Sequence, residues 1–390
     1  MYFPAFYLPL EGMGETLSTV YFSVIGVLAS YFFILAGANI VEMRRNTLPP
    51  AIIDGPLVSV LIPVRNEAAH IENCLTTLMQ QGYRNYEILV LDDDSQDTTW
   101  AIITKVAQTD SRIRIFSGSP LPDDWYGKSY ALQQLAGKAR GEILILTDAD
   151  TVHSPSSISW AVTNMCSSHA DFISGYVGQQ LRSFGEKITV PLMFFLTGFI
   201  IPLCLNRYTR YCFFSAAVGQ FIAIRKDVFM HIGGFTMMRN KTSEDMYLAR
   251  YVKAQGFKTL FLDVGEQVQC RMYTGYKAAV AGIGKNIFDF LGNHSVILVA
   301  MLFAVLFFLF LPFPLLCVIT LIPRNFQMNL LVVNILYTLT WMMLFIDRKI
   351  PWYYGLFWPL MFLNLIAMAL WSWFRTISGK GFLWKGRIVR

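Results

Sequence analysis

Residues 142–150 read EILILTDAD, an apolar run that ends in two aspartates one position apart, Asp148 and Asp150. The isoleucines and leucines follow one another without polar alternation, which is typical of a strand covered on both faces of a parallel sheet. Side chains directly after such a strand lie at its carboxyl end, where α/β sheets bind ligands. Two short carboxylates in that place suit a divalent cation that holds a diphosphate.

The chain on either side repeats this pattern. Residues 58–64 (VSVLIPV) and 87–91 (EILVL) predict two more buried strands, and the second ends in an acidic cluster that contains Asp92 and Asp93. Shorter strands are predicted at 113–116 and 172–177, with helices at 68–81, 98–108 and 129–139. This alternation predicts an α/β fold with a doubly wound, mostly parallel sheet, in which both acidic clusters lie at strand ends.

The composition indicates a membrane protein. Hydrophobic residues make up 54% of the chain and charged residues 15%, whereas soluble domains carry about 25% charged residues. Four stretches are long and apolar enough to cross a bilayer as helices, which takes about 20 residues. They are residues 17–41, 295–322, 329–346 and 351–374. Glu11 and Glu15 precede the first stretch, and Arg44 and Arg45 follow it. The positive-inside rule therefore places the N-terminus outside and the following polar block in the cytoplasm.

The expected organisation has five parts. They are an extracytoplasmic N-terminus at 1–16, a transmembrane helix at 17–41, a cytoplasmic domain at 50–288, transmembrane helices at 294–374 and a basic tail at 375–390. We expect a multi-pass protein of the inner membrane, with residues 189–205 lying as interfacial helices on its surface. Four spans would place the tail outside. Pro312 and Pro314 interrupt the second stretch, so a re-entrant pair there would return the tail to the cytoplasm, which we favour.

Charge and cysteine usage exclude other classes of protein. The net charge is +6, but basic and aromatic residues do not interleave as in nucleic-acid-binding segments, so no nucleic-acid partner is expected. The six cysteines form no CxxC pair, which speaks against a zinc or disulfide framework and favours reduced thiols.

Several polar residues are candidates for a site that binds an activated, phosphate-bearing substrate. Asp148 and Asp150 would hold Mg²⁺ or Mn²⁺, although aspartates after a strand also favour plain turns. Asp93, and after it Asp92, would accept the N–H of a uracil ring, with a turn as the alternative. Lys128, after Gly127, would balance phosphate charge, although such a pair is more often an ordinary loop.

Two further positions suit the reacting end of such a site. Glu244 and Asp245 precede an amphipathic helix, so either they favour its N-terminus or one of them is a general base, for which Asp245 is the better placed. Arg271 would contact the diphosphate, or else lie at the membrane edge. Gln220, in a Gly-Gln-Phe segment, would touch the acceptor.

These segments together resemble a known family. The order of four segments resembles an inverting family 2 glycosyltransferase of the A-type fold (a nucleotide-diphospho-sugar transferase). The segments are Val58–Asn66 with Glu67, then Asp92–Asp97, Asp148–Asp150 and Glu244–Asp245. The resemblance implies that Glu67 and Asp93 bind the nucleotide sugar, that Asp148 and Asp150 bind metal and diphosphate, and that Asp245, beside Glu244, is the catalytic base. Asp94 stands where the family often has glycine.

The resemblance narrows to enzymes that act on lipids. Four further segments resemble membrane enzymes such as the diaponeurosporenoate and chlorobactene glucosyltransferases of carotenoid synthesis. They also resemble hopanoid-associated and ceramide-type enzymes. The segments are Trp125–Lys128, Gly219–Phe221, Cys270–Tyr273 and Trp384–Arg387. Tyr273 is then an acceptor-binding residue. Val268 and Met272 replace the outer positions of the (Q/R)xxRW pattern of processive synthases, so transfer of a single sugar is implied.

The resemblance implies transfer of one hexose, with UDP-glucose as the expected donor, to a hydroxyl or carboxyl group of a lipid such as a carotenoid. Polyprenyl phosphate and ceramide-like lipids are alternative acceptors. A catalytically silent membrane scaffold and a secondary transporter are the alternatives from other classes. The transporter is disfavoured because the apolar stretches carry almost no charge with which to bind a polar solute.

Overall fold

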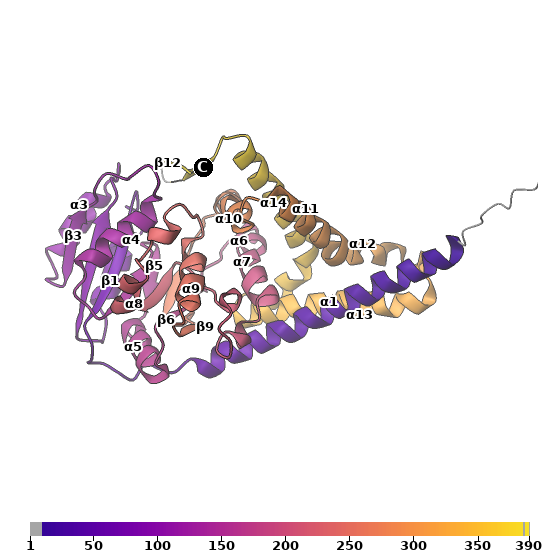
Figure 1. The fold of residues 1–390 in the computed structure, drawn as a ribbon, viewed down its shortest axis with the longest axis horizontal. Helices are drawn as coiled ribbons and strands as arrows, with labels where there is room; N and C mark the ends of the chain where they lie inside the picture. Colours follow the sequence, from indigo (N-terminus) through magenta and orange to yellow (C-terminus); the bar gives the residue numbers. More distant parts are fainter. Residues whose placement is uncertain (1–9, 385–386, 390) are drawn as a thin grey trace, which may run out of the picture.

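The computed structural model describes residues 10–384 and 387–389. Figure 1 shows an α/β domain at one end and a group of long helices that projects from it. Residues 1–9 of the expected N-terminal segment lie outside the described residues, and residues 10–16 form the start of the first long helix.

The main sheet has seven strands in the order β3-β2-β1-β4-β8-β6-β9. Their bounds are β1 Val58–Val64, β2 Tyr86–Asp92, β3 Ile113–Ser117, β4 Ile143–Thr147, β6 Phe172–Tyr176, β8 Phe221–Arg225 and β9 Thr259–Asp263. Four neighbouring pairs are parallel, and β8 is antiparallel to β4 and β6. The predicted α/β class is confirmed, and the sequence did not predict the antiparallel strand.

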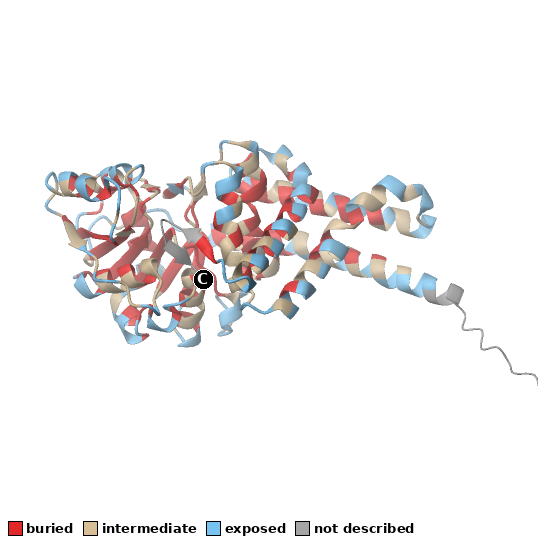
Figure 2. Cartoon of the chain, turned by 90° about the horizontal axis from the view of Figure 1, so that it is seen from above, coloured by how far each residue is buried: buried red, intermediate tan, exposed pale blue. Residues whose placement is uncertain are grey.

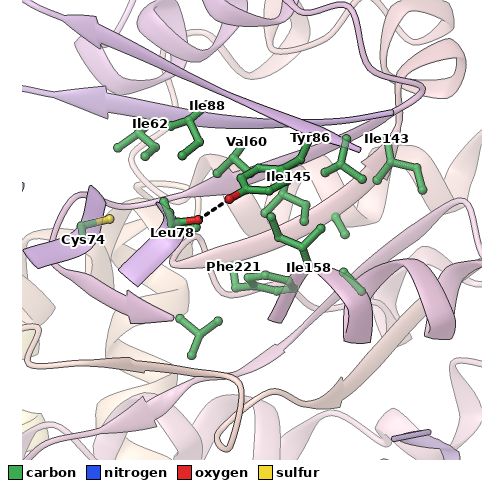
Figure 3. Close-up of a cluster of buried hydrophobic side chains, with 14 of the residues drawn as sticks. Val60, Ile62, Cys74, Leu78, Tyr86, Ile88, Ile143, Ile145, Ile158 and Phe221 are labelled. Carbon is green, nitrogen blue, oxygen red and sulfur yellow. Dashed lines mark hydrogen bonds between the residues drawn. The ribbon is translucent and has the colours of Figure 1, made fainter. Parts of the chain in front are cut away.

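Helices cover both faces of this sheet, as a doubly wound sheet requires. They are α2 (Ile71–Met79), α3 (Thr99–Ala107), α4 (Gly127–Lys138), α5 (Ser157–Ser168), α8 (Lys226–His231) and α9 (Glu244–Ala254). Figure 3 shows one apolar core, in which Val60, Ile62 and Ile88 of the sheet lie close to Leu78 of α2 and Ile158 of α5. A second core joins the other face of the sheet to α4, α8 and α9.

A small second sheet joins two segments that are far apart in sequence. Its strands are β5 (Thr151–His153), β10 (Val268–Cys270) and β7 (Gly178–Gln179), in the order β5-β10-β7. Thr151 pairs with Cys270. Because Thr151 follows Asp150 and Cys270 precedes Arg271, this pairing places Arg271 near the paired aspartates.

Four helical segments among the described residues are long and apolar enough to cross a membrane, at Gly14–Arg45, Ser295–Leu321, Arg324–Asp347 and Trp352–Ile377. The first lies within α1 (Leu10–Asn46), and the third is α13 (Arg324–Asp347). The second is α11 (Ser295–Ala304) with η5 (Val305–Phe310), α12 (Pro312–Leu315) and η6 (Leu316–Leu321). The fourth is η7 (Trp352–Phe357) with α14 (Trp358–Ile377). Many outward-facing residues of these helices are exposed (Figure 2) and apolar, as expected of surfaces that face lipid.

Residues 184–205 fold into short pieces, and the last two of these pack against α1. These are α6 (Phe184–Thr189), α7 (Leu192–Phe195), η1 (Leu196–Ile200) and η2 (Leu203–Leu205). Asn39 of α1 donates hydrogen bonds from Nδ2 to the carbonyl oxygens of Gly198 at 3.0 Å and Ile201 at 2.9 Å. None of these pieces is long enough to cross a bilayer.

The C-terminal part returns toward the α/β domain. Helix α10 (Tyr276–Phe290) packs between the domain and α14, and a small hairpin of β11 (Phe382–Trp384) and β12 (Arg387–Val389) ends the described chain. In Figure 1 this end lies toward the α/β domain, away from the α12 end of the long helices.

Candidate active site

One cavity of about 720 Å³ opens at the carboxyl ends of the sheet strands. It brings together most of the residues that the sequence singled out. Those that line it are Glu67, Asp93, Lys128, Asp148, Asp150, Gln220, Glu244, Asp245, Arg271 and Tyr273. Asp92 is not among the described residues that line the cavity. The predicted donor-binding and catalytic positions therefore share one space.

Lys128, in the first turn of α4, connects the two acidic groups of the cavity. Its Nζ lies 2.6 Å from Asp148 Oδ1 and 3.5 Å from Glu244 Oε1. Burial acts to lower the pKa of Lys128, but the charges of Asp148 and Glu244 outweigh burial and raise this pKa above its ordinary value. The ammonium therefore stays charged between the two groups of carboxylates.

Asp148 and Asp150 have the chemistry of a divalent-cation site. The Asp150 Oδ1 atom is buried and has no hydrogen-bond partner. Burial, and after it the charge of Asp148, raises the pKa of Asp150 to about 7. No group of three or more His, Cys, Asp or Glu residues in the described chain could hold a metal by itself. Mg²⁺ or Mn²⁺ bound through one or two carboxylates, with substrate phosphates and water as the other ligands, fits this set.

The end of β2 carries the second acidic cluster. Arg65 donates a hydrogen bond to the Asp93 carbonyl oxygen and another, at 2.8 Å, to that of Asp94, which holds this loop against the end of β1. Asp94 has a φ of 60°, a left-handed conformation that glycine adopts without strain and that aspartate tolerates. Aspartate is therefore compatible with a backbone conformation that glycine would also adopt.

Neighbouring aspartates of this loop have structural contacts. Asp92 Oδ2 accepts a hydrogen bond from the Ser95 amide at 3.1 Å, whereas its buried Oδ1 has no hydrogen-bond partner. Asp97 Oδ1 accepts from the Thr99 amide at 2.9 Å, so this aspartate stabilises the N-terminal turn of α3.

Glu244 and Asp245 begin α9 and point into the cavity. Asp245 accepts hydrogen bonds from its neighbour Met246 and from the Gly219 amide, both at 2.7 Å. Burial raises the pKa of Asp245, and it raises the pKa of Glu244 to about 7 with a further contribution from the Asp245 charge. A carboxylate that titrates near neutral pH is suited to general-base catalysis.

Gly219 lies close to the side chains of both Lys128 and Asp245. A Cβ atom at this position would lie 3.1 Å from Lys128 Nζ and 3.2 Å from Asp245 Oδ2. The backbone therefore lies close to both side chains, and a residue with a Cβ would crowd them.

The remaining predicted residues lie on the side of β10 and α10. Arg271 pairs with Glu186 at 3.0 Å, and its buried Nε has no hydrogen-bond partner. Gln220 donates from Nε2 to Cys270 Sγ at 2.9 Å and accepts from Gln179 at 2.9 Å, so its amide is held beside the paired aspartates. Tyr273 lies against Gly282 of α10, where a Cβ would be within 2.1 Å of its ring.

The cavity continues into an apolar half that the sequence did not reveal. Its lining there comes from Leu192, Met193, Phe195, Ile200, Ile283, Ile287, Phe290, Leu291, Met301 and Leu365. Lys285 and Asn286 of α10 also line the cavity. The spacing of Ile283, Ile287, Phe290 and Leu291 is the helical pattern that could have signalled one apolar face.

The sheet and the acidic cavity at its strand ends define the class of protein as an A-type glycosyltransferase fold. A mannosyltransferase from Pyrobaculum calidifontis, solved in complex with GDP-Man and Mn²⁺, has the same fold over 89% of this chain and 98% of its own, with a TM-score of 0.50 and 19% identity. Residues 59–233 match the model of Glycosyl transferase family 2, so this chain contains a domain of that family.

Curated relatives match over part of this domain. Glycosyltransferase AglE of Haloferax volcanii is 31% identical over 31% of this chain and 40% of its own length. The 4,4'-diaponeurosporenoate glycosyltransferase of Staphylococcus haemolyticus is 37% identical over 24% of each chain. Beta-monoglucosyldiacylglycerol synthase of Trichormus variabilis is 34% identical over 24% of this chain and 20% of its own. The match thus spans less than half of the length of each relative.

Proposed function

We propose that this protein is a membrane-bound inverting glycosyltransferase that moves a single hexose from a nucleotide sugar, with UDP-glucose as the expected donor, to a lipid. One observation carries the proposal: the cavity that holds the acidic cluster at the strand ends is continuous with an apolar chamber formed by the helices beside the membrane segments. A polar donor and an apolar acceptor would meet in it.

The donor would occupy the polar end. Asp93 would accept from the nucleotide base, and Asp148 and Asp150 would hold Mg²⁺ or Mn²⁺ against the diphosphate, whose charge such a cation neutralises. Lys128, whose amine lies at Asp148, and Arg271 would bind phosphate oxygens. Glu67 lines the same end of the cavity.

Asp245 would act as the base for a hydroxyl acceptor. The acceptor oxygen would attack the anomeric carbon opposite the diphosphate, its proton would pass to the Asp245 carboxylate, and the bond from the sugar to UDP would break. The amides of Gly219 and Met246 fix this carboxylate, so its orientation does not depend on the substrate. Glu244, which lies beside Lys128, would adjust the charge around the Glu244–Asp245 pair.

The apolar half supports a lipid acceptor. Nine hydrophobic side chains of α7, η1, α10, α11 and α14, together with Leu291 just after α10, would surround a hydrocarbon chain, with Gln220 and Tyr273 near its polar end. Relatives named for diaponeurosporenoate and for monoglucosyldiacylglycerol favour a carotenoid, another isoprenoid or a glycerolipid as acceptor.

The protein would be a multi-pass protein of the inner membrane with its catalytic domain in the cytoplasm. Arg44 and Arg45 lie in the last turn of α1, next to the α/β domain, as the positive-inside rule requires of a cytoplasmic boundary. The basic tail would also be cytoplasmic, because the chain ends toward that domain (Figure 1).

The test is transfer of radiolabelled glucose from UDP-glucose to a lipid extract by the purified protein in detergent. We expect label in an organic-soluble product with Mn²⁺ or Mg²⁺, little label with EDTA, and a loss of at least about 100-fold in Asp150→Asn. Asp54→Asn, at an exposed position away from the cavity, is the matched control. Binding of UDP without any transfer or hydrolysis would favour a silent scaffold. Mass spectrometry of the product would identify acceptor and sugar.

A further inference from the structure

A short loop outside the cavity presents large aromatic side chains at the protein surface. Tyr208 and Tyr211 are 73% and 74% exposed, and Phe213 is 51% exposed. Among the described residues that line the cavity, none comes from this loop, so the donor and acceptor sites do not account for these side chains. Large apolar groups that are exposed together mark a surface that another molecule covers.

Hydrogen bonds hold this loop, residues 206–215, at its base, and it is called the aromatic loop below. Asn206 Nδ2 donates to the carbonyl oxygen of Thr259 at 3.0 Å, and the Thr259 hydroxyl donates to Asn206 Oδ1 at 3.1 Å. At the other end, Ser215 Oγ donates to Thr259 Oγ1 at 3.2 Å. Both ends therefore meet at the first residue of β9, as in a compact Ω-loop, and the aromatic side chains project from a fixed base.

The aromatic loop lies beside the end of α1 that joins the α/β domain. The short helix η2, directly before the loop, packs against α1, and the Cys204 amide donates to Asn39 Oδ1 at 3.2 Å. Asn39 is near the end of the apolar stretch 17–41, shortly before Arg44 and Arg45. Strand β9, which holds the base of the loop, also lies beside this end of α1 (Figure 1). The loop is therefore at the level where α1 would leave the bilayer.

The composition of the aromatic loop suits the head-group region of a bilayer. Tyrosine favours the membrane–water interface, because its ring is apolar and its hydroxyl is polar. Arg210 is exposed between the two tyrosines, and residues 187–226 include no Asp or Glu. Arginine at this level attracts anionic lipids. The place of the loop at the end of a membrane segment favours a lipid surface over a protein partner.

We propose that the aromatic loop docks on the leaflet that faces the α/β domain, with Tyr208 and Tyr211 among the lipid head groups and Arg210 bound to the phosphate groups of anionic phospholipids. This contact would be additional to the four proposed spans and to the expected interfacial segment 189–205. It rests on the membrane placement in the proposed function, but on neither the sugar donor nor the acceptor.

Such docking would orient the catalytic domain over the membrane. The end of the aromatic loop, η3 (Cys212–Phe214), packs against α9, and the Arg250 guanidinium of α9 lies 5.8 Å from the centre of the Phe213 ring. Helix α9 begins with Glu244 and Asp245. The loop would therefore connect the lipid surface to the helix that carries the proposed base.

A native cysteine allows a direct test. Cys212 lies within the aromatic loop and is exposed. In a variant with Cys166, Cys204 and Cys317 replaced by alanine, Cys212 is labelled with the fluorophore NBD, and the two buried cysteines are retained. The protein is placed in nanodiscs that hold a single copy, so that a second copy cannot cover the loop. The lipids are phosphatidylcholine alone or mixed with phosphatidylglycerol, each with and without a doxyl-labelled lipid that quenches NBD on contact.

Doxyl lipid should quench NBD at Cys212, and about twofold more strongly with phosphatidylglycerol, because the anionic lipid attracts the basic loop. A matched variant that keeps Cys166, exposed on α5, in place of Cys212 should show no such quenching. Thermal midpoints verify that each labelled protein is folded.

Further variants assign the contact to its residues. Arg210→Gln should reduce the effect of phosphatidylglycerol and keep the quenching in phosphatidylcholine alone. Arg84→Gln, at an exposed position just before β2, is the matched control and should leave both unchanged. Tyr208→Ser combined with Tyr211→Ser should lower the quenching in both lipid mixtures.

Quenching at Cys212 no stronger than at Cys166, or equal in the two lipid mixtures, would overturn the inference. An effect of phosphatidylglycerol that is undiminished in Arg210→Gln would do the same. A blue-shifted NBD emission without lipid quenching would mean that protein covers the loop, which also contradicts docking on lipid. These measurements need no turnover, so a failure of the proposed function, seen as an absence of labelled sugar in any lipid, is distinguishable from each of these outcomes.

Discussion

The ammonium of Lys128 lies 2.6 Å from the carboxylate of Asp148 and 3.5 Å from that of Glu244, so one cation connects the proposed metal-binding pair to the proposed catalytic pair. Lys128 is in the first turn of α4, where the helix dipole disfavours a positive charge. The surrounding carboxylates offset this cost. We infer that the position of Lys128 is set by the cavity and not by the helix.

Lys128→Gln should lower kcat/KM for transfer by at least about 100-fold, because the carboxylates lose their shared cation and the diphosphate loses a donor. The same change should increase the thermal stabilisation that Mn²⁺ alone provides, since the added metal would then balance more uncompensated charge. Thermal unfolding with and without Mn²⁺, in the absence of UDP, measures this. Lys105→Gln, exposed on α3, is the control, and an equal gain in both variants would contradict this role.

Gly219→Ala should reduce activity about tenfold or more while leaving the fold intact. The new methyl group would lie 3.1 Å from Lys128 Nζ and 3.2 Å from Asp245 Oδ2, so one of these side chains must move, and small displacements of catalytic groups are costly. Gly137→Ala in α4 is the matched control, because a Cβ there meets nothing within 4 Å. Steady-state kinetics and thermal unfolding of both variants test this. Wild-type activity in Gly219→Ala would show that the close approach is unimportant.

The parts of the site that sequence could predict are those set by local structure. Asp93 and Asp148 follow short apolar runs that are typical of buried strands, and parallel strands bring their carboxyl ends to one edge. The sequence around Lys128 carries little signal, because the contacts of Lys128 with Asp148 and Glu244 form only in the tertiary fold.

The direction of strand β8 and the apolar wall of the cavity could not be predicted from the sequence, because both depend on the tertiary fold. Strand β8 is antiparallel between β4 and β6, and its five residues, FIAIR, carry no signal of direction. The apolar wall of the cavity comes from short helical pieces and from α10, whose hydrophobic residues are equally consistent with a plain core. Only their arrangement around one space distinguishes a binding chamber from a core.

Asp245→Asn should separate two kinds of acceptor. Transfer to farnesol requires removal of a proton and should fall by about 10²–10⁴-fold, whereas transfer to farnesoic acid, which is already ionised, should fall much less. Asparagine can still accept the Gly219 hydrogen bond, which lies at 2.7 Å in the wild type, so the loop should stay in place. Product formation with each acceptor at saturating UDP-glucose gives the ratio. Equal losses on both acceptors would argue against Asp245 as the base.

Native cysteines allow a test of the membrane topology. Cys166 on α5 and Cys317 in η6, near α12, are both exposed, and Figure 1 places α5 and α12 at opposite ends of the molecule. In intact cells a membrane-impermeant maleimide should label a variant that keeps only Cys317 if residues 295–322 cross the bilayer, whereas a re-entrant pair at Pro312 and Pro314 would leave Cys317 unlabelled. A variant that keeps only Cys166 should stay unlabelled. A Lys380→Cys variant without other cysteines should behave like the Cys166 variant if the tail is cytoplasmic. Its labelling in intact cells would place the tail outside.

Stability should depend on pH through Glu244, whose pKa is raised by burial from 4.5 to about 7. Between these values the unfolded chain releases this proton and the folded protein keeps it, so raising the pH favours the unfolded state. Glu244→Gln retains the neutral form at every pH. Its free energy of unfolding should therefore exceed that of the wild type by on the order of 1–3 kcal/mol at pH 8, with little difference at pH 4.5.

Thermal midpoints of both proteins in detergent, measured across this range, would show the difference growing as the pH rises. Glu72→Gln, exposed on α2, is the control and should show no such growth. If the Glu244→Gln difference were constant with pH, the carboxyl group would not be held neutral by its surroundings. Lys128 would then be a full counter-charge to Glu244, and the two residues would have to be treated as a permanent ion pair.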